Sequence, residues 1–450
     1  MCAARLAPVL AREIVPHDPA ELAARLRGER HLLLLDSAMR QEHFGRYSFL
    51  ACNPAQTITV QDGATHLDGE RVDEGALALL DRLLAEERCE PLPGLPPFQG
   101  GFAGFIGYDY GAVLEPSLRL PQGPGPQLML NRYDTVVAFD HLQERAWIIS
   151  RGGEAALDAM AAKLAAAQAP LGRASLAGFT SNFSRAGYEQ ALARTVDYVL
   201  AGDIFQANIA QQFSAPVDAG FDPFAFYLVL RQRNAAPFAA FLDFGTVVVA
   251  SASPERLVAL RGRLAEARPI KGTRRRDANP ARDAALIAEL MASRKDRAEN
   301  VMIVDLLRND LSRVAEPGTV MVPVLCGLES YAGVHHLTSV VTAKLQEGVA
   351  AGGLVAALFP GGSITGAPKI RAMEVIAEME GTPRSLYCGS LGYAGFSGAA
   401  DFSIAIRTVE FARDTARFSG GGGITARSRP AEEYDETLTK VARIQGAFAP

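Results

Sequence analysis

The chain has 450 residues, of which 48% are hydrophobic and 21% charged, and a formal net charge of −5 at pH 7. This composition is globular and excludes intrinsic disorder as the main state. No apolar run reaches the roughly 18 residues that span a bilayer, and the scattered basic residues leave no footprint for nucleic acid. The N-terminus lacks the apolar core of a signal peptide, so we expect a cytoplasmic protein. Neither a disulfide framework nor a zinc-binding spacing appears among Cys2, Cys52, Cys89, Cys326 and Cys388.

Stretches rich in proline, glycine and small residues predict joints at residues 91–97, 116–126 and 165–178. The last of these divides the sequence into an N-terminal region, residues 1–170, and a C-terminal domain, residues 180–447. Short apolar runs at 31–35 and 135–139 predict mixed strands and helices in the first part.

The second part shows clearer periodicity. We expect helices at 184–201, 281–314 and 368–381, and strands at 245–251, 257–260, 391–394 and 402–411. Strands and helices do not alternate strictly, so the sequence favours an α+β fold over a doubly wound sheet.

Two pairs of acids are spaced for one helix face each. Asp296 and Glu299 lie three residues apart, as do Glu433 and Glu436. Two such faces turned toward each other would offer the oxygen ligands that Mg²⁺ prefers. The alternative is that both pairs are ordinary solvated helix surface.

Two glycine-rich stretches have the composition of anion sites. One is Gly420 to Gly423; the other runs from Phe359 to Lys369 and leads into a helix. Consecutive glycines let backbone N–H groups approach an anion, and a helix N-terminus adds positive potential. A plain turn and a plain helix start are the alternative.

Three charged residues stand in distinctive settings. Arg407 follows small neighbours in a predicted strand, on the same face as Ser403 and Ala405, which leaves room for a carboxylate. Lys271 lies between an apolar residue and a glycine, beside three arginines, where a lysine can serve as a nucleophile. Glu255 is a candidate general acid. Each residue also has a simpler interpretation: Arg407 as a surface arginine, Lys271 as an exposed lysine and Glu255 as one glutamate among many.

Together these motifs resemble the chorismate-utilising enzyme family. The matching stretches are GDIFQANIAQQF (202–213), SPERL (253–257), PIKGT (269–273), KDRAENVMIVDLLRNDL (295–311), HLTSV (336–340), GGSITGAPKIRAMEVI (361–376), DFSIAIRT (401–408), GGGIT (421–425) and EEYDET (432–437). The N-terminal stretches LLLLDS (32–37), GRYSFL (45–50) and GGFAGFIGYDYG (100–111) resemble the region paired with it in anthranilate and aminodeoxychorismate synthases. The resemblance implies large antiparallel sheets packed as a sandwich with surrounding helices.

Two positions separate branches of this family. Lys271 resembles the aminodeoxychorismate synthase pattern, where anthranilate synthases have alanine. Gln206 stands where water-adding members carry a lysine that activates water. The pair implies amination of chorismate to 4-amino-4-deoxychorismate, an amino-group transfer that feeds 4-aminobenzoate and folate biosynthesis. Anthranilate synthase component I of tryptophan biosynthesis is the close alternative, and a non-catalytic regulatory subunit is the alternative of another class.

The resemblance also implies roles. Glu255 matches the general acid, Lys271 the covalent nucleophile and His336 a histidine beside the departing hydroxyl. Glu299 and Glu436 match ligands of Mg²⁺, supported by Asp296 and Glu433. The matching substrate-binding positions are Arg407, Tyr393, Gly421, Gly422, Gly423, Ser363, Gln206 and Thr273.

Some positions depart from the family pattern. Asp296 replaces a frequent Glu, Asn300 a frequent His, and Arg427 and Arg429 replace acids. Relatives hold tryptophan in the N-terminal part, and the matching residues are Asp36, Ser37, Arg46, Tyr47 and Ser48. Because Asp36 replaces the usual Glu, tryptophan binding stays open. No Gly-x-Cys-x-Gly nucleophile elbow occurs, so ammonia is expected from solution or from a glutamine amidotransferase subunit.

Overall fold

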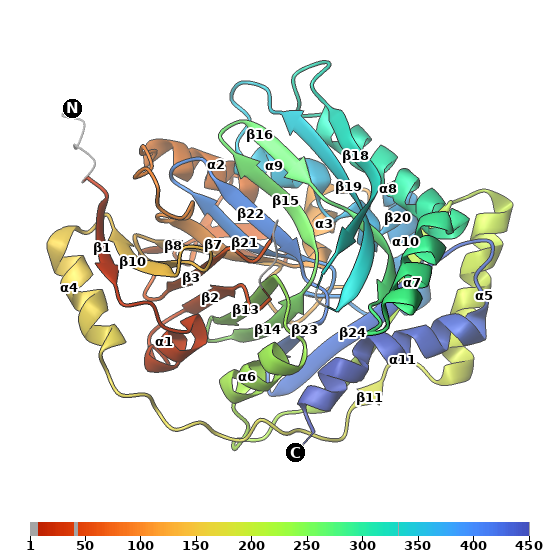
Figure 1. Ribbon diagram of the computed structural model, residues 1–450, viewed down its shortest axis with the longest axis horizontal. Helices are drawn as coiled ribbons and strands as arrows, with labels where there is room; N and C mark the ends of the chain where they lie inside the picture. Colours follow the sequence, from red (N-terminus) through yellow and green to blue (C-terminus); the bar gives the residue numbers. More distant parts are fainter. Residues whose placement is uncertain (1–7, 40–43, 332, 450) are drawn as a thin grey trace.

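A computed structural model describes residues 8–39, 44–331 and 333–449 of the chain. Within them, two twelve-stranded antiparallel sheets and eleven α-helices make up the molecule (Figure 1). The prediction of an α+β fold with large antiparallel sheets is confirmed.

The first sheet takes its strands from both ends of the chain. Its order is β1 (Leu10–Ile14), β10 (Arg145–Ser150), β9 (Thr135–Asp140), β3 (Tyr47–Ala51), β2 (Leu32–Asp36), β13 (Phe238–Asp243), β14 (Val247–Ser253), β23 (Thr408–Ala412), β24 (Thr415–Ile424), β12 (Gln206–Pro216) and β11 (Thr180–Ser181). The short β20 (Gly366–Ala367) also pairs with β12.

The second sheet is equally mixed. Its order is β17 (Ile270–Arg275), β19 (Val334–Lys344), β16 (Leu264–Ala267), β15 (Arg256–Arg261), β22 (Ala400–Ile404), β21 (Ser390–Gly395), β7 (Gly101–Ile106), β8 (Leu128–Tyr133), β4 (Gln56–Gln61), β5 (Ala64–Leu67) and β6 (Glu70–Val72). A further strand, β18 (Met321–Ser330), pairs with β19.

The inner faces of the two sheets share one apolar core. Phe49 and Val249 of the first sheet lie in the same buried cluster as Phe105 and Leu391 of the second. Alternation of apolar residues along the strands supplies these faces, because successive side chains point to opposite sides. The prediction of a sandwich is therefore confirmed in its packing.

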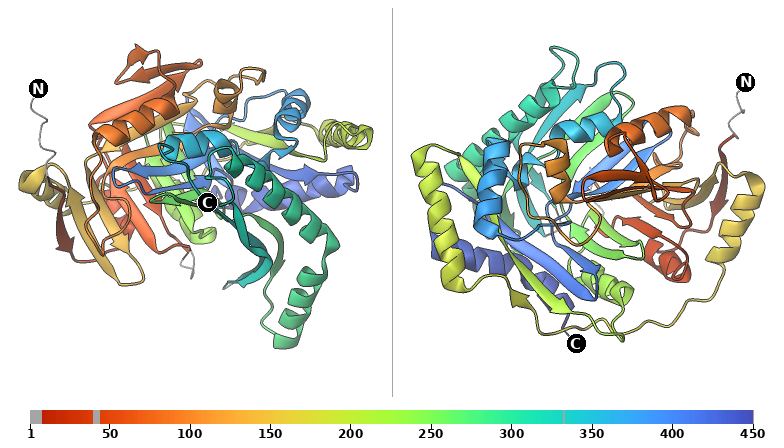
Figure 2. Two further views of the ribbon diagram at one scale, coloured as in Figure 1. Left: turned by 90° about the horizontal axis from the view of Figure 1, so that it is seen from above. Right: turned by 180° about the vertical axis from the view of Figure 1, so that it is seen from behind.

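Helices cover the outer faces (Figures 1 and 2). Over the first sheet lie α1 (Pro19–Arg25), α4 (Gly153–Leu164), α5 (Arg185–Ala201), α6 (Pro223–Arg233), α10 (Lys369–Glu380) and α11 (Pro430–Ala447). Against the second sheet lie α2 (Ala76–Glu86), α7 (Pro280–Ala292), α8 (Arg294–Ser312) and α9 (Ala351–Leu358), while the short α3 (Gly111–Leu114) follows the 3-10 turn η1 (Tyr108–Tyr110). None of the helices in the described ranges is long and apolar enough to cross a membrane.

The joint predicted at 165–178 is a long surface segment between α4 and β11, visible as a yellow strap along the lower edge of Figure 1. Strands from before and after it stand side by side in both sheets: β2 pairs with β13, and β7 with β21. The two predicted regions thus share both sheets and the core between them.

Most of the predicted elements of the C-terminal part are present. The helix predicted at 184–201 is α5, capped by the Ser184 hydroxyl, which accepts from the Gly187 N–H at 3.1 Å. The predicted helical region 281–314 is two helices, α7 and α8, interrupted at Ser293.

The strand predicted at 402–411 is wrong as one element. It is two strands, β22 and β23, in different sheets, and Arg407 between them has a φ of +51°. The predicted alternation that placed Ser403, Ala405 and Arg407 on one face therefore fails at Arg407.

Candidate active site

The chain crosses from one sheet to the other at two neighbouring places, and each crossing carries a predicted site residue. Glu255 lies between β14 and β15, and Arg407 between β22 and β23. The Ile404 N–H donates to the Glu255 carbonyl at 2.9 Å, and the Ala252 N–H donates to the Arg407 carbonyl at 3.1 Å. These backbone bonds hold the acid and the guanidinium next to each other.

Lys271 enters the same site from β17, where the ladder with β19 is irregular between Ile270 and Thr273. The next residue, Gly272, has a φ of +82°, and a Cβ there would lie 2.9 Å from the Cβ of Asp296. Both conditions require glycine. The half-buried Lys271 ammonium donates to the Ser363 carbonyl at 3.3 Å.

The electrostatics of Glu255 show which groups surround it. Burial raises the pKa of Glu255 above its usual range, against the opposing effects of the Lys271 ammonium, a hydrogen bond from Ser363 and the Arg407 guanidinium. A carboxyl with a raised pKa keeps a proton at higher pH, as a general acid must. The structure thus brings Glu255, Lys271, Ser363 and Arg407 together.

Arg407 is available for a ligand. Within the described part of the chain the Arg407 guanidinium has no hydrogen bond or ion pair to protein. Desolvation by the surrounding protein and repulsion from Arg443 lower the pKa of Arg407, and Glu255 opposes them. A free guanidinium in these surroundings suits a carboxylate.

His336 of β19 and Thr273 of β17 form a second pair at this site. The Thr273 hydroxyl lies 2.8 Å from His336 Nδ1. Burial, and then the charge of Arg407, lower the pKa of His336 to about 4. The imidazole is therefore neutral at pH 7 and can exchange hydrogen bonds without carrying charge.

The predicted acids come from α8 and α11. Burial raises the pKa values of Glu299 and Glu433, and Glu436 adds to both shifts by repulsion. Burial also acts to raise the pKa of Glu436, but Lys440, whose ammonium lies 2.7 Å from its carboxylate, lowers it overall. Asp296 also raises the pKa of Glu299 by repulsion, so the four acids share one electrostatic neighbourhood.

The fourth acid, Asp296, also has a cation partner on β17. Its carboxylate lies 3.5 Å from Arg274, and its Cβ packs on Gly272. Across residues 8–39, 44–331 and 333–449, no three His, Cys, Asp or Glu side chains are close enough together to enclose a metal ion. A four-carboxylate cage is not preformed among these residues, whereas Glu299 and Glu436 are close enough to repel each other.

The glycines Gly421 to Gly423 lie in strand β24, so the plain turn that the sequence left as an alternative is wrong. Gly421 accepts a hydrogen bond from Lys440 at 2.8 Å through its carbonyl, so this carbonyl points away from β12. In an antiparallel strand the N–H and C=O of one residue point the same way, and alternate residues repeat the direction. The Gly421 and Gly423 amides thus face outward from the ladder.

Gln206, the first residue of β12, is 1% exposed, and both polar atoms of its side chain lack a partner among the described residues. A Cβ on Gly423 would lie 2.6 Å from its amide nitrogen. The predicted Gln206 and Gly423 are therefore neighbours, and Gly421 lies two residues earlier on the same strand, opposite Ala210.

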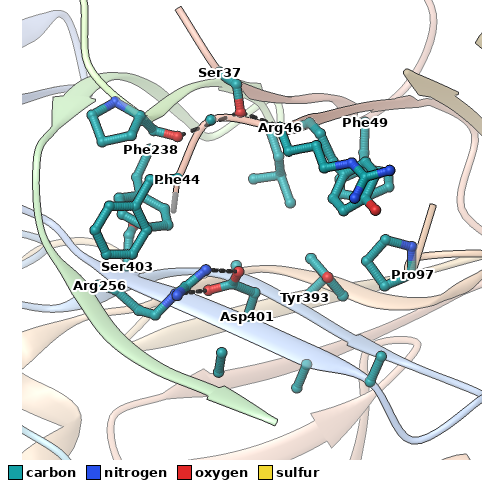
Figure 3. A pocket seen from close by; sticks show the side chains of 18 of the residues that line it. Ser37, Phe44, Arg46, Phe49, Pro97, Phe238, Arg256, Tyr393, Asp401 and Ser403 are labelled. Carbon is teal, nitrogen blue, oxygen red and sulfur yellow. Dashed lines mark hydrogen bonds and ion pairs between the residues drawn. The ribbon is translucent and has the colours of Figure 1, made fainter. Parts of the chain in front are cut away.

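The structure places Tyr393 away from this site, which corrects its predicted role. It is 5% exposed and lies in a cavity of about 490 Å³ between the sheets (Figure 3). Its ring stands 4.6 Å from that of Phe98 and 5.3 Å from that of Phe49. The period-2 pattern could not reveal this, because Tyr393 faces the inter-sheet core and Arg407 follows a crossing.

This cavity contains the residues predicted for tryptophan. Asp36, Ser37, Arg46 and Tyr47 line it, together with the Arg256–Asp401 ion pair, whose closest atoms are 2.8 Å apart. Ser48 lies behind the lining and donates to Asp36 at 3.2 Å.

The carboxylate of Asp36 is turned away from the cavity. It accepts from Arg231 at 2.5 Å and from the Tyr227 hydroxyl at 2.9 Å, and its side chain is fully buried. An aspartate held in this way offers no free acceptor to an ammonium group in the cavity. The tryptophan assignment stays a prediction.

Comparisons with known proteins agree with the site that this geometry describes. Residues 30–446 fit the family model for chorismate binding enzymes. The chain is 40% identical to aminodeoxychorismate synthase component 1 of Klebsiella aerogenes, over 92% of each chain. It is 36% identical to anthranilate synthase component 1 of Geobacillus stearothermophilus, over 95% of this chain and 90% of the relative. The crystal structure of anthranilate synthase component I from Streptococcus pneumoniae TIGR4 superposes with a TM-score of 0.81 at 30% identity, covering 90% of this chain and 95% of that one.

The chain belongs to the chorismate-binding enzyme family and is a chorismate-utilising enzyme. It resembles the amination branches, aminodeoxychorismate and anthranilate synthases, at nearly equal identity.

Sequence reasoning missed two lysines at this site. Lys440 pairs with Glu436, and Lys295 lies 4.0 Å from Glu299. Lys440 stands four residues after Glu436, and Lys295 stands four residues before Glu299, a spacing that places each lysine and its acid on one helix face. That signal was present in the sequence.

Proposed function

We propose that this enzyme is an aminodeoxychorismate synthase, which converts chorismate to 4-amino-4-deoxychorismate. The observation that supports the proposal best is the position of Lys271. Its ammonium lies between the Ser363 carbonyl and Glu255, and anthranilate synthases are expected to carry alanine at this position.

The reaction follows from these neighbours. Glu255 donates its proton to the ring hydroxyl at carbon 4, which departs as water. The Lys271 ammonium first gives a proton to solvent, and the free amine attacks ring carbon 2 as the bond from carbon 4 to the hydroxyl oxygen breaks, so that both ring double bonds move by one position. Ammonia then attacks carbon 4, the double bonds move back and Lys271 leaves as the free amine, while the new ammonium group returns a proton to the Glu255 carboxylate. The enolpyruvyl group stays attached throughout.

Binding is assigned to the groups that are free to bind. Arg407 pairs with the enolpyruvyl carboxylate, and the Gly421 and Gly423 amides face the ring carboxylate. The neutral His336, held by Thr273, lies beside the departing hydroxyl. Gln206 cannot take a proton from water, which favours a nitrogen nucleophile over hydration.

The donor set fits Mg²⁺ of the kind held by one or two carboxylates and by substrate oxygens. Glu299 and Glu436 would be its ligands, with Glu433 in support. Magnesium would neutralise the substrate's ring carboxylate.

Ammonia is proposed to come from a glutamine amidotransferase subunit. The support is that similar proteins are named component 1, which implies a second component.

The product identifies the activity. The pure chain, incubated with chorismate, Mg²⁺ and an ammonium salt at mildly alkaline pH, is expected to yield a mass that retains the enolpyruvyl group. Anthranilate plus pyruvate would contradict the proposal and establish the alternative. If chorismate is unchanged both alone and with an added glutamine amidotransferase, the chain is the non-catalytic form.

Lys271→Ala tests the nucleophile. Loss of the covalent route is expected to lower the amination rate by at least about 100-fold, because the single-step displacement is much harder. Chorismate binding, measured by calorimetry, should persist through Arg407. Amination at the wild-type rate would remove Lys271 from the mechanism.

A further inference from the structure

Ser363 contacts both reacting groups of the site. Its carbonyl accepts from the Lys271 ammonium, and its hydroxyl is a hydrogen-bond partner of Glu255. Its place in the fold therefore fixes the distance between acid and nucleophile. Ser363 lies in a short 3-10 turn, η2 (Gly362–Ile364), between α9 and α10, and it is 9% exposed.

The residue after it is held by two buried side chains from other elements. The Ile364 carbonyl accepts from Asn208 Nδ2 of β12 and from Arg384, each at 3.2 Å. The Asn208 N–H also donates to the Thr365 carbonyl at 2.8 Å. Asn208 is 8% and Arg384 5% exposed, so water does not compete for these bonds.

Arg384 is itself held on every side. Its guanidinium lies 2.6 Å from the Glu380 carboxylate, stands 4.7 Å from the Tyr108 ring and donates to the Asn208 carbonyl. Glu380 accepts in turn from the Ala210 N–H of β12 at 2.8 Å. Groups from β12, α10 and η1 thus hold the Arg384 guanidinium, which in turn holds the Ile364 carbonyl beside the reacting groups.

We propose that Asn208 and Arg384 are positioning residues for the amination: they fix the Ile364 carbonyl, so that Ser363 presents its carbonyl to Lys271 and its hydroxyl to Glu255. This inference rests on the proposed function and adds to it residues that do not touch the substrate. Neither residue was singled out by the sequence, because the link passes through a backbone carbonyl.

Asn208→Ala and Asn208→Asp test it, with Gln212→Ala as the matched control. Gln212 lies on the same strand, and its amide donates to the Pro383 carbonyl at 3.1 Å, which joins β12 to the segment before Arg384 without touching the Ser363 turn. Amination kinetics are measured over pH, and folding is checked by thermal unfolding.

Asn208→Ala is expected to lower kcat about tenfold or more, with the KM for chorismate changed less than about twofold, because small misplacements of reacting groups are costly. When the Ser363 hydroxyl is displaced, its hydrogen bond stabilises the ionised form of Glu255 less, so the pKa of Glu255 rises. The alkaline limb of the pH profile therefore moves upward by about 0.5–1 pH unit. Asn208→Asp should lower kcat further, since a carboxylate oxygen would face the Ile364 carbonyl. Gln212→Ala should stay within about twofold of the wild type.

A lower unfolding temperature in Asn208→Ala with unchanged kcat and an unmoved alkaline limb would overturn the inference and leave Asn208 a structural role alone. If the Asn208 variants do not fold, Arg384→Lys takes their place with the same expectations, because lysine keeps the charge and loses the fork that reaches Ile364.

A readout independent of activity separates this inference from the proposed function. Reductive methylation of Lys271, followed by peptide mass spectrometry, is expected to be faster in Asn208→Ala, since the Lys271 ammonium is released from the Ser363 carbonyl. Faster labelling in an enzyme that makes no aminated product would uphold the positioning and refute the function. Normal amination together with equal labelling would uphold the proposed function and refute the positioning role.

Discussion

Glu255 must hold a proton while two cations stand beside it. Desolvation raises its pKa, and Lys271 and Arg407 pull it back, so the protonated fraction depends on the balance. A substrate carboxylate on Arg407 would neutralise one of these cations and raise the pKa of Glu255 further. The general acid is thereby expected to be protonated when chorismate is bound.

Glu255→Gln tests this at the level of one group. Glutamine keeps the shape and cannot supply the proton, so kcat is expected to fall about 10²–10⁴-fold. In the wild type kcat should fall as pH rises through the pKa of Glu255, and this alkaline limb should vanish in the variant. A limb that survives the substitution would belong to another group. His336, with a pKa of about 4, should add no limb near neutrality.

A second buried carboxyl controls stability instead of chemistry. Burial raises the pKa of Asp109 to about 7, and Glu410 adds repulsion, while the Ser385 and Arg384 backbone and the charge of Arg384 oppose the shift. An unfolded aspartate titrates near about 4. The folded state therefore binds more protons between these values, and the stability that Asp109 contributes is lost as pH rises from about 4 to about 7.

Asp109→Asn removes this dependence and preserves an acceptor for the Ser385 N–H. Denaturant unfolding at pH 5 and pH 8 is expected to show a smaller loss of stability in the variant than in the wild type. The Glu410 carboxyl, whose pKa burial also raises, should account for part of the loss that remains. Equal losses in both proteins would contradict the assignment.

At the residue scale, the sequence predicts which residues form the site, but it does not predict where their side chains point. Glu255, Lys271 and Arg407 could be chosen from their settings and from the family resemblance. Tyr393 was assigned to the wrong place because its neighbours in space, Phe49 and Phe98, come from the N-terminal part of the chain. Nothing local in the sequence encodes that contact.

At the scale of the elements, the three glycines of strand β24 differ in how strongly an added Cβ would disturb the structure. A Cβ on Gly421 would collide with the Ile209 backbone, one on Gly423 would lie 2.6 Å from the Gln206 amide, and one on Gly422 would lie 3.2 Å from Glu433. Backbone cannot move aside, a buried side chain only 2.6 Å away moves at a cost, and a side chain 3.2 Å away needs to shift by only a few tenths of an ångström.

Alanine substitutions at the three glycines should therefore destabilise in the order 421, 423, 422, with the largest loss about 2–3 kcal/mol. Thermal unfolding of the three variants measures the order. Gly422→Ala should remain folded and alter the acid pair instead. Any other order would mean that the strand shifts to accept the added methyl groups.

Element boundaries were predictable where a chemical signal ended them. Ser184 and the glycine at 202 bound α5, and Ser293 separates α7 from α8 by accepting from the Asp296 N–H. The break in the strand at 402–411 had no such signal. It arises because the chain changes sheets there, which is a property of the whole fold.

At the scale of the molecule, the strap at 165–178 joins two parts that are not separate bodies. Cleavage within it should leave a single particle, because β2 remains paired with β13 and β7 with β21. Limited proteolysis followed by size-exclusion chromatography is expected to show both fragments in one peak, with activity retained. Separate peaks would mean that the shared sheets do not hold the parts together.

The same interleaving has a consequence for how the chain is made. When the ribosome has released the first 170 residues, β2 and β7 still lack partners at residues 238–243 and 390–395. Contacts of such long sequence separation slow folding, and unpaired strand edges are prone to aggregate. The nascent N-terminal part must wait for nearly the entire polypeptide, so chaperones should bind it during synthesis and release it only once the C-terminal strands emerge.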